Sequence, residues 1–310
     1  MAEFEDLGRG VYCIDALYIQ PRVASIYLLR EGDEAAIVET GTSHSLANVL
    51  ATLDALEISR SEIKYVIPTH VHLDHAGGAS AMMREFGEAS LIIHPRGARH
   101  MADPGKLIDG TVAVYGREKF DRLYGRIEPI DEARIRVAED LQCFSLNSRE
   151  LLFLDTPGHA RHHFCIYDEA SSGVFTGDTF GLSYDVMKDL PRGLVPTTPP
   201  TQFDPSALHE SIARIIAYRP QRLFLTHYGE FDHPEAQVPS FDRWIDTYVE
   251  ICERLQPDDE SAERQLESEL NRAVLAEFEA RRDEVARVLK MDLHLNAQGL
   301  AYWWRSAHRG

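Results

Sequence analysis

Four side chains able to bind a metal ion fall within six residues of the sequence, in the segment His70-x-His72-x-Asp74-His75. Buried imidazoles and carboxylates are costly to cluster unless a cation compensates them, so the segment predicts a metal site. In an extended segment, residues two apart point the same way, and His70 and His72 can therefore bind one ion. Asp74 and His75, after the turn, would then face a second ion.

Three further candidate ligands lie downstream, each directly after an apolar run with strand character. His159 ends the segment 155–159, Asp178 lies in the segment 175–179, and His227 follows a run that begins at Arg222. Strand ends bring residues that are distant in sequence to one edge of a sheet, so we expect these side chains to share a site with the first cluster. The predicted metal ligands are His70, His72, Asp74, His75, His159, Asp178 and His227.

The elements that must position these side chains form two β-rich halves around a helical middle. Strands are expected at residues 11–19, 24–30, 35–39, 63–68, 91–94, 142–146, 150–155, 164–167, 173–176 and 222–226. Helices are expected at 45–56, from the glycines after His75 to about 86, and at 96–101, 111–123, 205–217, 241–255 and 261–289. This order predicts an α/β fold with two sheets packed face to face and helices outside.

The same pattern predicts the domain organisation. Residues 1–238 form a catalytic domain with a polar, helical insertion at about 95–139, and residues 239–310 form a helical C-terminal appendage. The appendage could serve packing or formation of a homodimer. The proline-rich segment 179–205 is predicted to be a long loop, and a loop of this length in a compact domain usually has a functional role, here as a wall of the site.

Composition excludes several classes of partner. With 32 basic and 50 acidic residues the net charge is −18, which repels nucleic acid, so a small-molecule substrate is expected. An acidic N-terminus and the lack of an apolar run of about 18 residues predict no membrane span and a cytoplasmic location. The four cysteines are far apart and contain no Cys-x-x-Cys pair, so neither a disulfide framework nor a thiolate zinc site is expected.

On these motifs the chain resembles the metallo-β-lactamase superfamily, in the dinuclear branch that includes glyoxalase II and lactonases, over about residues 10–235. The blocks that carry the resemblance are Glu39-Thr40-Gly41, the histidine cluster, Pro157-Gly158-His159, Gly177-Asp178-Thr179 and Thr226-His227. The resemblance implies an αββα four-layer sandwich. It also implies that one metal is bound by His70, His72 and His159 and the other by Asp74, His75 and His227, with Asp178 bridging the two.

The sequence departs from the family at two positions. Glu39 stands where an aspartate is more common, which changes the reach of a carboxylate that supports the ligands. Gly181 stands where lactonases of the acylhomoserine type are expected to carry a tyrosine. His163 matches a second histidine of the glyoxalase-like Gly-His-x-x-x-His pattern, and we interpret it as structural.

The chemistry follows from two ions, which together lower the pKa of a bridging water to about 7 and make hydroxide available. This hydroxide would attack a small ester, thioester, lactone or phosphoester. The residues predicted to be catalytic are His70, His72, Asp74 and Asp178, and those predicted to contact substrate are Tyr184, Lys188, Arg192 and Tyr228. The mixed ligand set suits zinc first, with iron or manganese as alternatives.

Several other functions share parts of this pattern. Glyoxalase II would need a basic cluster for glutathione, and only Lys188 and Arg192 are suitably placed, while a β-lactamase would be expected to carry a secretory signal. A flavo-diiron oxidoreductase would resemble a His-x-Glu-x-Asp-His cluster, whereas this chain has His72 at the glutamate position and no flavodoxin-like region after His227. A metal-containing regulator that binds a ligand without turnover is a third class of function, beside the hydrolase and the oxidoreductase.

Overall fold

The computed structural model of the protein describes residues 3–188, 190, 193–198 and 201–308, and the chain divides into two compact units. The first unit contains Met1–Asp155, His162–Gly177 and Gln221–Glu230. The second unit contains Thr156–Arg161, Asp178–Pro220 and Phe231–Gly310. The predicted ligands are therefore divided between the units, with His159 and Asp178 in the second and the other five in the first.

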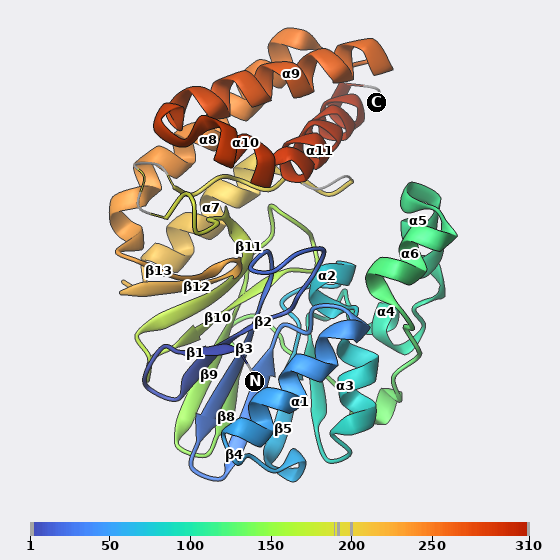
Figure 1. Ribbon diagram of the computed structural model, residues 1–310, viewed down its shortest axis with the longest axis vertical. Coiled ribbons are helices and arrows are strands. Elements are labelled where there is room, and N and C mark those ends of the chain that lie inside the picture. Colours follow the sequence, from blue (N-terminus) through green and yellow to red (C-terminus); the bar gives the residue numbers. More distant parts are fainter. Residues whose placement is uncertain (1–2, 189, 191–192, 199–200, 309–310) are drawn as a thin grey trace. The chain divides into compact units, whose positions relative to one another are not determined.

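A seven-stranded sheet in the first unit has its strands in sequence order from β1 to β7. Figure 1 labels β1 to β5 of this sheet. The first four strands are antiparallel neighbours, of which β2, β3 and β4 correspond to predicted strands, and β4 to β7 are parallel. The central strands are buried almost throughout, as expected where both faces of a sheet are covered. The strands are β1 Phe4–Asp6, β2 Val11–Asp15, β3 Ser25–Glu31, β4 Glu34–Val38, β5 Ile63–Ile67, β6 Ser90–Ile93 and β7 Ile135–Val137.

A six-stranded sheet has the order β13-β12-β11-β10-β9-β8. The two sheets pack against each other through aromatic rings: Tyr27 of β3 contacts Phe175 and Phe224, with ring centroids 5.3 and 5.5 Å apart. The Tyr27 hydroxyl also donates a hydrogen bond to the backbone oxygen of Leu225. The two-sheet arrangement predicted from the sequence is thus present. The strands are β8 Cys143–Leu146, β9 Arg149–Asp155, β10 Phe164–Asp168, β11 Gly173–Leu182, β12 Arg222–His227 and β13 Gly229–Asp232.

Strand β11 is longer than predicted. It has ten residues, all buried, whereas the predicted strand ends at Thr176. The expectation that Asp178 follows the end of a strand was therefore wrong, because Asp178 lies inside β11. Gly177 has a φ of +48°, and a Cβ atom there would overlap Nε2 of His163 and Oγ1 of Thr69. The strand can continue past these side chains only because this residue is glycine.

In the first unit, helix α1 contacts β2, and helix α3 contacts β5 and β6. Both helices are labelled in Figure 1. The predicted helix at 111–123 is two helices, because Gly116 has a φ of +78° and ends α5 before α6 begins. The predicted insertion at about 95–139 contains these helices and also β7, which pairs with β6. The helical elements are η1 Ser43–Ser45, α1 Leu46–Ala55, η2 Arg60–Glu62, α2 Leu73–Ala76, α3 Ala79–Glu85, α4 Ala98–Ala102, α5 Gly105–Tyr115, α6 Arg117–Tyr124 and η3 Glu132–Arg134.

The second unit is mainly helical. Helix α7 begins as predicted, with the Asp204 side chain accepting a hydrogen bond from Ala207 N and a proline at the first position. The last helix, α11, was not predicted. The predicted domain boundary between 238 and 239 falls inside α8. The helical elements are α7 Pro205–Ile216, α8 Pro234–Leu255, α9 Glu260–Glu277, η4 Glu279–Arg281, α10 Arg282–Val288 and α11 Lys290–His308.

Among the described residues, no helix combines the length and the apolar character that a membrane span needs.

Candidate metal centre

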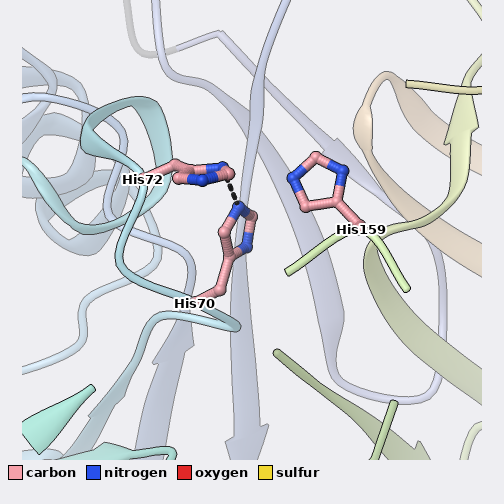
Figure 2. A group of neighbouring side chains, drawn as sticks. All are labelled: His70, His72 and His159. Atoms are coloured by element: carbon pink, nitrogen blue, oxygen red, sulfur yellow. Dashed lines mark hydrogen bonds between the residues drawn. The ribbon is translucent and has the colours of Figure 1, made fainter. Parts of the chain in front are cut away.

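The histidine cluster begins in the turn between β5 and α2 and continues into α2, which starts before the predicted helix. His72 is the N-cap residue of α2, whose first turn carries Asp74 and His75. Nε2 of His70 and Nδ1 of His72 lie 2.8 Å apart. Figure 2 shows this pair with a dashed line, together with His159, a residue of the second unit. Because His70 is fully buried and His72 is half-buried, the two imidazoles form a compact, partly enclosed set of nitrogen ligands.

A second set of ligand atoms in the first unit comes from Asp74, His75 and His227. One ligand atom from each lies within 4.8 Å of the others, a spacing that could hold a metal ion. Oδ2 of Asp74 is 3.8 Å from Nε2 of His75 and 3.7 Å from Nε2 of His227. We call the five residues His70, His72, Asp74, His75 and His227 the first ligand group.

In two histidines of this group, Nδ1 already has a hydrogen-bond partner. Nδ1 of His75 lies 3.0 Å from Oε1 of Glu39, and Nδ1 of His227 lies 2.9 Å from the backbone oxygen of Val23. Both partners are acceptors, so each Nδ1 carries the proton and each Nε2 presents a lone pair. This is the tautomer that a metal-binding histidine needs, with its other nitrogen held by an acceptor. The residues present therefore fit a divalent ion.

Glu39 is the carboxylate that supports this group. Its side chain is 1% exposed, and its Oε1 accepts hydrogen bonds from the hydroxyls of Thr69, at 2.6 Å, and Thr226, at 2.9 Å. Its Oε2 accepts from the backbone nitrogen of Thr69 at 3.1 Å. At this position the family more often has aspartate. The longer side chain of Glu39 reaches donors from β12, from α2 and from the segment that follows β5.

Loss of solvation favours the neutral form of His72, which is the form that binds metal. Burial lowers the pKa of His72 to about 4 and that of His162 to about 3. Burial also lowers the pKa of His163, whose ring centroid lies 4.9 Å from that of His70. For Asp74 burial acts to raise the pKa, but the charges of His75 and His227 outweigh burial and the net shift is downward.

The second unit holds the other two predicted ligands, His159 and Asp178, which we call the second ligand group. Both are buried, and Nε2 of His159 lies 3.3 Å from Oδ2 of Asp178. Thr197 contacts both: its Oγ1 is 3.1 Å from Nδ1 of His159 and 3.4 Å from Oδ2 of Asp178. An imidazole lone pair and a carboxylate oxygen at this separation repel each other unless a proton or a cation lies between them. This donor pair also fits a metal ion.

The predicted substrate contacts have different environments. Tyr184 is buried, and its hydroxyl donates to Oδ1 of Asp292 at 3.2 Å. Lys188 lies 3.7 Å from Oδ1 of Asp185. Tyr228 is buried, with the guanidinium carbon of Arg22 4.3 Å from its ring centroid. Arg192 lies outside the described residues. Contact with substrate stays a prediction for all four.

Sequence reasoning missed three threonines of the site. Thr69 and Thr226 each precede a ligand histidine at the end of a strand, so the repeated Thr-His pair was a usable signal. Thr197 had no such signal, because it lies in a proline-rich stretch 19 residues after Asp178. Its contacts with His159 and Asp178 can be found only in the structure.

The site and the fold together define a scaffold for metal-dependent hydrolysis, and comparison with known proteins gives the family. The model of the metallo-β-lactamase superfamily matches residues 19–227, which is more than half of the chain. The chain belongs to this superfamily, and the predicted αββα fold class is confirmed. The glyoxalase II-like branch within it stays a prediction.

Sequence identity to individual proteins is low, but the matches extend over much of the chain. A metallo-β-lactamase fold-containing protein of Sulfurisphaera tokodaii is 26% identical over 226 residues, covering 71% of this chain and 79% of that protein. A human acyl-coenzyme A thioesterase is 24% identical over 188 residues, covering 56% of this chain and 64% of that protein, less than two thirds of its length. A solved structure of a metallo-β-lactamase family protein from Thermus thermophilus superposes with a TM-score of 0.69 at 18% identity, covering 97% of this chain and 95% of that one.

These findings support a metal-dependent hydrolase in general terms, and the superfamily fold implies that divalent metal is bound. The structure with high coverage shares the fold along nearly the whole chain, including the C-terminal helices.

Proposed function

We propose that this protein is a dinuclear metal-dependent hydrolase that cleaves a small ester-type substrate, with a thioester as the first candidate. The observation that carries the proposal is the group Asp74, His75 and His227, in which both histidines have Nδ1 engaged and Nε2 directed to the carboxylate. Thioesters are placed before esters, lactones and phosphoesters because a relative of this chain is named an acyl-coenzyme A thioesterase.

The proposed site joins the two ligand groups. One ion would be bound by His70, His72 and His159, a second by Asp74, His75 and His227, and Asp178 would contribute to both. Zinc suits this mixture of imidazole and carboxylate, and iron or manganese could replace it. When bound, such ions supply a water of lowered pKa and polarise the carbonyl oxygen under attack.

The residues of the chain then have distinct tasks. Burial lowers the pKa of His72 to about 4, so this histidine presents a lone pair at neutral pH. Glu39 fixes the ring of His75, and the backbone oxygen of Val23 fixes that of His227. The Asp74 side chain is 26% exposed, so it is accessible to a substrate and could carry a proton from the attacking water to the leaving group.

The test is turnover and metal content of the full chain. Purified protein loaded with zinc is assayed on short-chain acyl-coenzyme A thioesters, simple esters, lactones and a phosphodiester. We expect hydrolysis of at least one class, strongest for thioesters. We expect that His72→Ala or Asp178→Ala abolishes turnover and lowers the metal content measured by mass spectrometry, because each removes a ligand.

Matched controls remove the same residue types from the exposed surface. His308→Ala and Asp109→Ala should retain the activity and the metal content of the unmodified protein. Unchanged turnover in either His72→Ala or Asp178→Ala would contradict the mechanism. A protein that binds metal but hydrolyses no member of the panel would favour the ligand-binding regulator instead.

A further inference from the structure

The segment 193–198 brings a hydroxyl to the second ligand group. Val195 pairs with Leu182 at the end of β11, through two backbone hydrogen bonds of 2.9 Å, so the segment runs antiparallel to that strand. Two residues further on, Thr197 reaches His159 and Asp178. The position of its hydroxyl therefore depends on what holds residues 196–198.

One side chain from the last helix provides this hold. Asn296 of α11 is 2% exposed, and its Oδ1 accepts a hydrogen bond of 2.7 Å from the backbone nitrogen of Thr198. Its Nδ2 donates to the backbone oxygen of Pro196 at 2.9 Å. The backbone oxygen of Asn296 accepts from the hydroxyl of Thr198 at 2.9 Å. Three hydrogen bonds from one residue thus bracket Thr197 on both sides.

Packing alone does not account for an asparagine at this position. Asparagine is a poor residue in a helix interior, and a buried amide is costly unless it is hydrogen-bonded. The neighbouring buried positions of α11 include Leu293, Ala297 and Leu300, which provide the apolar packing face. The amide of Asn296 instead matches the two backbone groups that flank Thr197, which indicates a role in fixing that residue.

The hydroxyl of Thr197 can set the protonation of the ligand histidine. If Nδ1 of His159 donates to Oγ1 of Thr197, the hydroxyl hydrogen is directed to Asp178, whose Oδ2 and backbone oxygen lie at 3.4 and 3.5 Å. Nε2 of His159 then presents a lone pair. The hydroxyl is the only side-chain group of Thr197 that can accept from one ligand while it donates to the other.

We propose that Asn296 is a positioning residue, which acts through Thr197 to hold His159 as the Nδ1–H tautomer and to orient Asp178 for metal. The metal part of this inference rests on the proposed function. The helical C-terminal region then contributes to the site, although the predicted ligands lie elsewhere in the chain.

The first readout needs no metal. In the metal-free full chain with labelled histidines, nitrogen-15 NMR reports which ring nitrogen of His159 carries the proton, with His159→Gln used to assign the signal. We expect the Nδ1–H form in the unmodified protein and in Thr197→Ser, which keeps the hydroxyl. We expect a mixture of tautomers in Thr197→Val and in Asn296→Ala.

The second readout is metal affinity, measured by competition between the full chain and a zinc chelator. Loss of a group that orients a ligand typically costs about 10- to 100-fold in affinity, and we expect this for Thr197→Val and Asn296→Ala at one of the ions. The matched control is Gln298→Ala, which removes a side-chain amide of the same helix whose hydrogen bond goes to His294, and which leaves Thr197 untouched. It should keep both the tautomer and the affinity of the unmodified protein.

The outcomes separate the two proposals. If Asn296→Ala does not fold, as judged by circular dichroism, Thr197→Val and Thr197→Ser carry the test, because Thr197 is only half-buried. An unmodified protein that binds no zinc overturns the proposed function, and the NMR arm still decides the role of Asn296. An unchanged tautomer in folded Asn296→Ala and Thr197→Val, or an unchanged zinc affinity in both, overturns the positioning role.

Discussion

The two ligand groups differ in what holds them. In the first group, the single buried carboxylate of Glu39 accepts hydrogen bonds from Thr69 and Thr226 and lies against Nδ1 of His75. In the second group, support comes from the neutral hydroxyl of Thr197, which Asn296 brackets from a helix about one hundred residues further along the chain. The first group is thus supported by a carboxylate, and the second by a hydroxyl that a side-chain amide holds in place.

This difference predicts different responses to mutation. Several donors share the carboxylate of Glu39, so its loss affects them all at once. Thr197 and Asn296 act in series and carry no charge themselves, so each loss should be smaller and graded. The difference should appear in stability as well as in metal binding.

The largest effect is expected for Glu39→Ala. Each buried donor left without its acceptor costs about 1–3 kcal/mol, so we expect the free energy of unfolding to fall by about 3 kcal/mol and metal content to fall with it. Urea unfolding of the metal-free and zinc-loaded protein measures both effects. Glu39→Gln, which keeps the size and loses the charge, should retain part of the stability. An unchanged unfolding midpoint in Glu39→Ala would remove the contrast between the groups.

A smaller effect is expected for Thr226→Val. This change removes one hydroxyl that donates to Glu39 and keeps the shape of the side chain, so the cost should be about 1 kcal/mol. Glu39 keeps its contacts with Thr69 and His75, and metal content should hardly change. The comparison that sharpens the contrast is Thr197→Val, which should affect metal affinity more than stability. The reverse order would mean that the carboxylate and the hydroxyl play equivalent roles.

The smallest effect is expected for Lys188→Ala in the second unit. The ion pair of Lys188 with Asp185 has an N···O distance of 3.7 Å and is partly exposed, so its loss should change stability by less than about 1 kcal/mol. If Lys188 contacts an anionic part of the substrate, KM should rise several-fold while kcat and metal content stay constant. Steady-state kinetics on the preferred substrate decides this, and an unchanged KM would exclude the contact.

Much of the first ligand group could be predicted from the sequence, because its ligands lie close together and directly follow predicted strands. His70, His72, Asp74 and His75 occupy one turn, and His227 ends a strand that periodicity identifies. The supporting threonines were missed, although the Thr-His pair occurs at both places. The local sequence pattern was therefore sufficient to predict the ligands, but not the threonines that support them.

The second group was harder to predict because its geometry depends on contacts that are distant in sequence. The predicted strand at 173–176 is too short because a glycine and an aspartate both disfavour strand by propensity, yet β11 continues through Gly177 and Asp178. Helix α11 has apolar and small residues at helical spacing, but Asn296 and Gly299 interrupt the apolar pattern. The pairing of Asn296 with residues 196–198 can be seen only in the structure.

Gly177 limits how freely this sequence can diverge. A side chain there would meet both a histidine ring and a threonine hydroxyl, and the left-handed backbone adds a conformational penalty. In a saturation library sorted for folded protein, this codon should retain glycine, whereas Gly87 and Gly110, which have open space around the Cβ position, should accept alanine. In a homologue that lacks this glycine, we expect the histidine or the threonine beside it to be replaced as well.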